Sequence, residues 1–210
     1  SGKYWLSKRT DRAVANMGFD SIAKFGDVTV YKNKFVLPFG FTYDKAIGED
    51  EFKKLSPTQK DFCLLRACII SNEDKATFNF LKPFNVADTV APITFDNYMA
   101  YVNERKVDKF TISKFSDNNI VGSIDANEAK VLFFSIPFDE GWHVKVNGAD
   151  AKLCRINAGL TGLPIIKGTS KVELTFEPRL KAKGAAISIA ALVVFFGLLG
   201  FTFIRRRKEK

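Results

Sequence analysis

The sequence predicts a mainly β protein with an α+β N-terminal section, in which an antiparallel, jelly-roll-like β-sandwich is followed by one C-terminal transmembrane helix. Three observations predict this fold class. From about residue 77, short segments rich in β-branched and aromatic residues recur at intervals of about ten residues, as in a sandwich or barrel. A strong helix start precedes them at Ser56. Residues 184–204 carry no charge.

The composition is that of a folded domain with an additional apolar segment. The 210 residues suffice for one domain and a further element. Hydrophobic residues make up 46% and charged residues 26%, which excludes disordered and collagen-like chains. The mean hydropathy of −0.05 averages an ordinary soluble sequence and one apolar stretch, so a purely soluble protein is not expected.

Changes in these patterns divide the chain into five parts. The helix start lies in the first part, the regularly spaced strands in the second, and the uncharged stretch in the fourth. The predicted parts are an α+β extracytoplasmic section (1–76), an antiparallel β-sandwich (77–178), a juxtamembrane link (179–183), a transmembrane helix (184–204) and a cytoplasmic basic tail (205–210).

The first section is expected to combine strands with helices. Ser56 is a good N-cap, Pro57 suits the first helical position, and Gln59 completes a capping box three residues after the cap. Alternating residues with high β-propensity mark the strands. The expected elements are strands at 3–7 and 28–36 and helices at 49–55 and from 57 to about 71.

The second part is expected to consist of strands, with no helix between residue 77 and the membrane segment. Asn147-Gly148 is the strongest hairpin signal, because it supplies the two positive φ angles of a type I′ turn. The expected strands are 109–115, 120–125 and 130–136 as a meander, 142–146 and 149–153 as the hairpin, and 161–166 and 171–176 as a further pair.

The uncharged stretch is long enough to cross a membrane. At about 1.5 Å per residue its 21 residues reach about 31 Å, and a hydrocarbon core is about 30 Å thick. The basic tail 205–210 follows directly, and positive residues stay on the cytoplasmic side. Residues 1–183 are therefore expected outside the cytoplasm, with the basic link 179–183 near anionic lipid headgroups.

The first residues cannot themselves translocate this domain, since the chain starts with neither Met nor an apolar leader. A removed signal peptide or earlier membrane spans are expected upstream. Ala186, Ala190 and Gly197 fall near one face of the span and favour earlier spans, because small residues let helices approach closely.

No cofactor or metal site is expected. Cys63, Cys68 and Cys154 are too few for a disulfide framework, and the first two, read as parts of one helix, are expected in the core. A single histidine, His143, leaves zinc almost no ligands. Nucleic acid is not an expected partner despite the pI near 9.4, because the domain is expected outside the cell.

Candidate substrate-binding residues are aromatic and basic. Trp142 is either a core anchor of the sandwich or a platform on which a sugar ring stacks. Tyr101 and Arg105 are further candidates for binding a sugar. Asp139 and Glu140 are adjacent and point to opposite faces of a strand, so they do not form the carboxylate pair of a glycosidase. No catalytic residue is assigned.

Several short segments carry a resemblance to a known family. Each is weak alone, but their order and spacing are specific. The segments are Lys3-Tyr4-Trp5-Leu6-Ser7, Val30-Tyr31-Lys32-Asn33, Leu37-Pro38-Phe39-Gly40-Phe41, Ser135-Ile136-Pro137-Phe138-Asp139-Glu140-Gly141-Trp142, Val146-Asn147-Gly148, Leu163-Pro164, Lys167-Gly168, Phe176-Glu177-Pro178 and Lys183-Gly184. With them, most of the chain resembles the C-terminal part of the YfhO family of bacterial multi-span membrane proteins. Asn147 departs from the acidic residue of many relatives.

This resemblance implies a large membrane protein similar to glycosyltransferases that take a sugar from a polyprenyl-phosphate donor and add it, outside the cell, to envelope polymers such as teichoic acids. Such enzymes carry their essential carboxylates in an early extracytoplasmic loop, to which no residue of this chain corresponds. The chain is therefore expected to be accessory or to bind the acceptor, and not to catalyse.

The expected partners follow from the same resemblance. They are the lipid bilayer, preceding transmembrane helices of the same protein, and a cell-wall polymer or a polyprenyl-linked sugar. A second hypothesis, from another functional class, is a membrane-tethered carbohydrate-binding or adhesin-like module without enzymatic activity.

Overall fold

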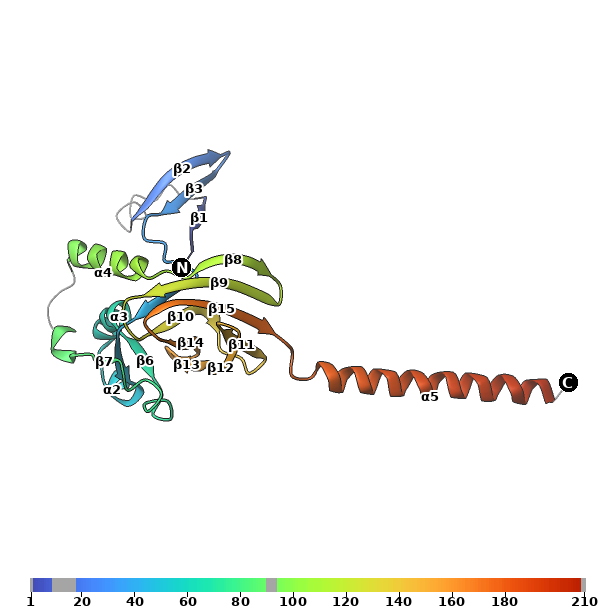
Figure 1. Ribbon diagram of the computed structural model, residues 1–210. Helices are drawn as coiled ribbons and strands as arrows, with labels where there is room; N and C mark the ends of the chain where they lie inside the picture. Colours follow the sequence, from blue (N-terminus) through green and yellow to red (C-terminus); the bar gives the residue numbers. More distant parts are fainter. Residues whose placement is uncertain (1, 9–17, 90–93, 209–210) are drawn as a thin grey trace.

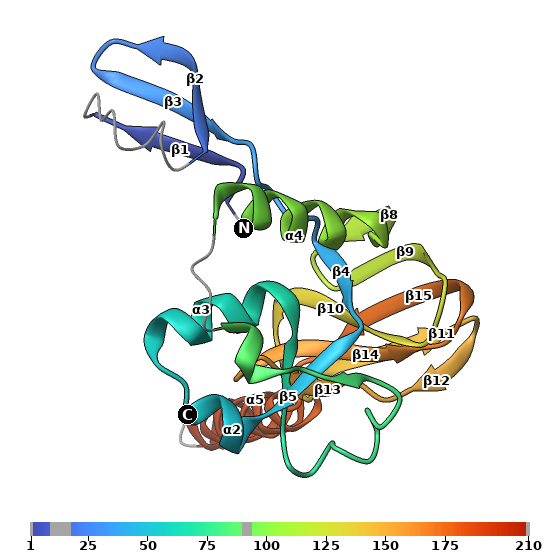
Figure 2. The same cartoon turned by 90° about the vertical axis from the view of Figure 1, so that its left-hand side faces the viewer.

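Two β-sheets packed face to face form the body of the protein, and helices pack against one edge of the larger sheet (Figure 1 and Figure 2). The computed structural model describes residues 2–8, 18–89 and 94–208. Strands from both sides of residue 76 share the larger sheet, so the predicted first and second parts have a common core.

The smaller sheet is antiparallel throughout, and its five strands run in the order β12-β11-β15-β9-β8. Central strand β15 lies between β9 and β11 and ends where the chain leaves toward the C-terminal helix (Figure 1). The bounds are β8 (Thr111–Ser116), β9 (Asn119–Ala126), β11 (Trp142–Val146), β12 (Ala149–Ala151) and β15 (Gly168–Phe176).

The larger sheet has seven strands in the order β4-β10-β14-β13-β6-β5-β7. Strand β5 is parallel to both β6 and β7, and the other pairs are antiparallel. The bounds are β4 (Gly40–Tyr43), β5 (Lys45–Gly48), β6 (Cys68–Ile70), β7 (Lys82–Pro83), β10 (Lys130–Pro137), β13 (Cys154–Ile156) and β14 (Leu160–Ile165).

Strand β10 is apolar on both faces because both faces are covered. Leu132 and Phe134 pack into the core between the two sheets, whereas Val131 and Phe133 pack into a second core on the opposite face. Side chains alternate along a strand, so an almost continuous hydrophobic run is what a doubly buried strand requires.

The mainly β class with one C-terminal apolar helix is confirmed, and the hairpin at Asn147-Gly148 is confirmed by φ angles of 52° and 86°. The pairing predicted for 161–166 and 171–176 is wrong. These strands, β14 and β15, lie in different sheets. The predicted meander is also incomplete, because β10 leaves β9 for the other sheet, and the jelly-roll-like order is not confirmed by these strand orders.

The capping box is confirmed at the start of α3 (Pro57–Arg66), where the Gln59 amide donates to Ser56 Oγ and the Ser56 amide to Gln59 Oε1. The helix ends earlier than predicted, since the chain turns to extended backbone at Ala67 and enters β6. Cys63 and Cys68 therefore do not share a helix. The short helix predicted at 49–55 is α2 (Glu49–Lys53).

A helix lies where none was predicted. Helix α4 (Phe95–Val107) begins at Thr94, whose side chain accepts a hydrogen bond from the Asn97 amide, and a 3₁₀ turn, η1 (Val86–Thr89), precedes it in the chain. Only Val102 and Arg105 of α4 are buried, so its sequence lacks the apolar stripe that marks a helix.

A separate three-stranded antiparallel sheet projects from the body (Figure 1 and Figure 2). Strand β3 (Val28–Asn33) is its centre, between β1 (Tyr4–Ser7) and β2 (Phe19–Phe25). The companion strand predicted at residues 3–7 is thus confirmed as β1.

The C-terminal helix α5 (Lys181–Lys208) extends away from the body as a single rod (Figure 1). Within it, Lys181–Phe201 has a mean hydropathy of 2.4 and is not buried by the rest of the chain. Among the described residues, it is the one helix long and apolar enough to cross a membrane. Residues 209 and 210 of the predicted tail lie outside the described part.

All three cysteines are free and buried, and the core position expected for Cys63 and Cys68 is confirmed. Burial raises the pKa of Cys63 to about 11, that of Cys68 to about 12 and that of Cys154 to about 11, because a thiolate is poorly solvated inside the protein.

We expect these raised thiol pKa values to reduce stability in alkali. The folded state holds the thiol protons more tightly than the unfolded chain, so the free energy of unfolding should be constant below about pH 8 and fall as pH rises toward the folded pKa values of about 11 to 12. Iodoacetamide at pH 8 should modify the thiols only after unfolding. Modification of a native thiol at the rate of a small free thiol would contradict this account.

Candidate functional site

Trp142 begins strand β11 and lies opposite Phe176 of β15, with the two ring centroids 5.0 Å apart. It is half-buried and packs against the core between the sheets, as do Val144 and Val146 on the same face of the strand. His143 points to the other face and is exposed, as predicted. The packing of Trp142 fits a core anchor, and its remaining surface is free for a further contact.

The loop before Trp142 is tightly fixed. The Gly141 amide donates to Asp139 Oδ1 at 2.7 Å, and the Glu177 amide donates to the Gly141 carbonyl at 2.8 Å. A Cβ atom on Gly141 would lie 2.6 Å from the Glu177 carbonyl oxygen, so the close approach requires glycine. Glu140 pairs with Arg179. Asp139 and Glu140 are thus engaged in holding the loop.

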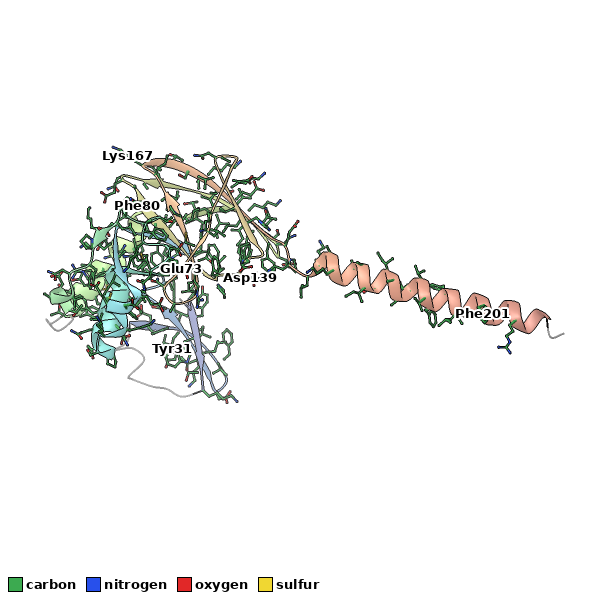
Figure 3. All side chains as sticks on the ribbon, turned by 90° about the horizontal axis from the view of Figure 1, so that it is seen from below. Tyr31, Glu73, Phe80, Asp139, Lys167 and Phe201 are labelled. Atoms are coloured by element: carbon green, nitrogen blue, oxygen red, sulfur yellow. The ribbon has the colours of Figure 1, made fainter. Side chains whose placement is uncertain are left out.

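Two adjoining cavities, of about 520 and 310 Å³, lie beside this loop and share Phe138, Lys152 and Leu153 as lining residues. Together they form one groove. Trp142 and Asp139 line one end, and the 71–74 loop lines the other. Figure 3 labels Glu73 and Asp139 on the same side of the body, with Asp139 nearer to the start of α5.

The groove is acidic. Its cations are Lys152 and Arg155, which are both exposed, and His143 is its one titratable imidazole. Aromatic surface comes from Phe138 and Trp142. The lining carboxylates are Glu49, Glu73, Asp74, Asp139, Glu140 and Asp150.

Tyr101 lies on α4, away from the groove. Its ring packs edge-on against Phe62 at 5.9 Å, and the Arg66 guanidinium lies 5.0 Å from its centroid. It is half-buried against the core formed by α3 and the edge of the larger sheet. Tyr101 thus contributes to packing between α3 and α4.

Arg105, one turn further along α4, is 5% exposed and ties three elements together. Its guanidinium donates hydrogen bonds to the carbonyls of Thr42 on β4 and of Leu65 and Arg66 at the end of α3. It also stacks over the Tyr43 ring at 4.6 Å. A cation at a helix C-terminus is favoured by the unpaired carbonyls there.

The structure therefore brings Tyr101 and Arg105 together but separates both from Trp142. Trp142 lies in the groove, whereas Arg105 lines a smaller pocket of about 290 Å³ with Asp44, Asp108 and Lys130. Sequence reasoning missed Lys152, Arg155 and Glu73. Lys152 lies in the second strand of the predicted hairpin, 149–153, and could have been found from it, but nothing in the sequence places the 71–74 loop beside it.

Within the described ranges, no group of three or more His, Cys, Asp or Glu side chains could hold a metal ion. The chemistry that the groove offers is therefore that of hydrogen-bonding carboxylates, two cations and an aromatic surface.

Comparison with known proteins gives one family and one relative. The family model described as bacterial membrane protein YfhO matches residues 89–188. The chain is 22% identical, over an alignment 312 positions long, to the uncharacterized protein YfhO of Bacillus subtilis strain 168, and the alignment covers 99% of this chain and 36% of the relative. The chain thus spans about a third of the length of this curated relative. No solved structure matches this chain.

We expect Arg105→Met to destabilise the body by about 3 kcal/mol, because it leaves buried carbonyls of three residues without donors. Asn103→Ala, at an exposed position of the same helix, is the control and should change stability by less than about 0.5 kcal/mol. Denaturant unfolding, followed by Trp142 fluorescence in chains that also carry Trp5→Phe, measures both. Equal effects of the two substitutions would show that Arg105 does not hold the three elements together.

Proposed function

Because the chain belongs to the YfhO family of bacterial membrane proteins, we propose that it is the extracytoplasmic C-terminal domain and last membrane anchor of a multi-span protein. In this proposal α5 crosses the membrane, the body lies outside the cell, and the basic residues from Arg205 onward lie in the cytoplasm. The length and hydropathy of α5 support the anchor, and the positive charge after it supports the orientation.

The whole protein, in this proposal, transfers a sugar from a polyprenyl phosphate to a cell-envelope polymer such as a teichoic acid. The family resemblance supports this part. The chain itself contributes recognition, because Asp139 and Glu140, the adjacent carboxylates beside Trp142, are engaged with Gly141 and Arg179. Neither is placed as a free general acid or nucleophile.

The groove supports sugar binding by this domain, and it is the observation on which the proposal depends. A sugar ring presents an apolar face to an aromatic side chain and its hydroxyls to carboxylates, amides and cations. Phe138 and Trp142 provide the first kind of contact, and Asp150 and Lys152 are exposed at the same place for the second.

The charge of the groove indicates which sugar it accepts. Its six carboxylates outnumber Lys152 and Arg155, so a polyanion would be repelled along most of its length. An uncharged saccharide avoids this repulsion. We therefore assign the groove to a neutral sugar unit, either of the acceptor or of the lipid-linked donor.

A membrane-tethered carbohydrate-binding module without enzymatic activity is the second candidate, and the same groove supports it. The two candidates differ in one measurable property. Sugar transfer by the whole-length protein in membrane vesicles, with a polyprenyl-phosphate sugar as donor, should fall at low acceptor concentration when Lys152 is replaced by Ala. Absence of any transfer by the wild type would leave the binding module.

We expect Lys152→Ala to weaken binding of neutral oligosaccharides at least about tenfold, because a hydrogen bond from a charged donor contributes about 1.5 kcal/mol or more. Lys167→Ala is the matched control, because Lys167 is also exposed but lies at the end of the body far from Asp139 (Figure 3). Titration calorimetry on the whole chain in lipid nanodiscs measures both. No binding of hexose or N-acetylhexosamine oligosaccharides by the wild type, or equal affinity of both variants, would refute sugar binding by the groove.

A further inference from the structure

The end of the body from which α5 leaves is assembled from the end of β15 and two separate loops. The Phe176 amide donates to the Asn118 carbonyl at 2.9 Å, which brings the turn between β8 and β9 beside the end of β15. The Glu177 amide donates to the Gly141 carbonyl, which brings the loop before β11 to the same place. These bonds fix the loops next to the first turn of α5.

This end carries an aromatic cluster that the cores do not fully bury. Phe115 is 66% exposed and has its ring 6.3 Å from that of Phe39, and Leu180 is 69% exposed. Large apolar side chains gathered on an otherwise soluble surface mark an interaction site. We call the following residues the helix-proximal end: Phe39, Phe115, Phe138, Trp142, Phe176 and Leu180.

The link to α5 is too short to hold this end far from a membrane. Four residues separate Phe176 from Lys181, and the five steps between these two Cα atoms span at most about 17 Å when fully extended. The link is also turned, since the Lys181 amide donates to the Pro178 carbonyl and the Gly184 amide to the Leu180 carbonyl. A headgroup layer of about 5 to 8 Å on each side of the hydrocarbon lies within that reach.

The charge around the link also favours contact with a membrane. Arg179 pairs with Glu140, which leaves Lys181 and Lys183 as the cations at the start of α5, against the nearby carboxylate Glu177. Basic residues next to a membrane-crossing helix are attracted to anionic headgroups, and aromatic side chains are enriched at the same depth.

We propose that the helix-proximal end rests on the surface of the bilayer that α5 crosses, with its aromatic side chains at the level of the lipid headgroups. The occupant of this apolar surface is phospholipid. Contact with lipid requires no sugar and does not depend on the proposed transferase role. Because Phe138 and Trp142 also line the groove, that end of the groove opens beside the lipid surface.

Fluorescence quenching by a lipid with a nitroxide on its headgroup tests this contact. The reporter is Phe115→Trp, placed in a chain in which the two native tryptophans are replaced by Trp5→Phe and Trp142→Phe. The matched control is Ile166→Trp in the same background. Ile166 is 72% exposed, close to the 66% of Phe115, but it lies just before the start of β15, at the opposite end of that strand.

In vesicles of phosphatidylcholine and phosphatidylglycerol, we expect the nitroxide lipid to reduce fluorescence about twofold at position 115 and to leave position 166 unchanged. The chain carrying only Trp5→Phe repeats the measurement on native Trp142, which should also be quenched without any change to the packing of the body.

Phe196→Trp, on the exposed surface of α5, reports separately on insertion through a nitroxide on the acyl chain. Quenching at 196 with equal quenching at 115 and 166, or with none at 115 and Trp142, would overturn lipid contact by this end. Lack of quenching at 196 would overturn it as well, because α5 would then not lie in lipid. None of these outcomes changes the sugar-binding measurements.

Discussion

The double burial of β10 is the constraint on which the rest of the body depends. Leu132 and Phe134 close the core against the five-stranded sheet, while Val131 and Phe133 close the core on the opposite face. A strand covered on both sides fixes its neighbours in register, because a shift of one residue would exchange the two sets of side chains. The five-stranded sheet on one side and the segment that contains Phe78 and Leu81 on the other are thereby held in one arrangement.

Local sequence patterns predicted the positions of helices and strands better than they predicted which strands pair in a sheet. The alternation of the strands, the Ser56 capping box and the Asn147-Gly148 turn each depend on residues close in sequence, and all were found in the structure. Pairing depends on tertiary packing, so β14 and β15 were wrongly joined. Helix α4 was missed for a related reason, since a buried arginine takes the place of an apolar residue in its stripe.

The candidate site shows the same division. Trp142 could be selected from the sequence because a large aromatic residue at a strand start is conspicuous. The groove beside Trp142 could not be predicted from the sequence. Its walls come from α2, the 71–74 loop and the segment after β12, which only the fold brings together. For Arg105 the sequence predicted a ligand-binding cation, whereas the structure shows hydrogen bonds to backbone carbonyls of β4 and α3.

Because the connection between β15 and α5 is short, a movement of the helix is transmitted directly to the sheet. Strand β15 is the middle strand of its sheet, hydrogen-bonded along both edges, and four residues separate its last residue from the first of α5. Tilting or rotation of the helix within a lipid bilayer would thus apply torque to the centre of the sandwich and not to a loose edge. The body would turn with α5, and a change in the tilt of α5 would alter the angle at which the groove faces its surroundings.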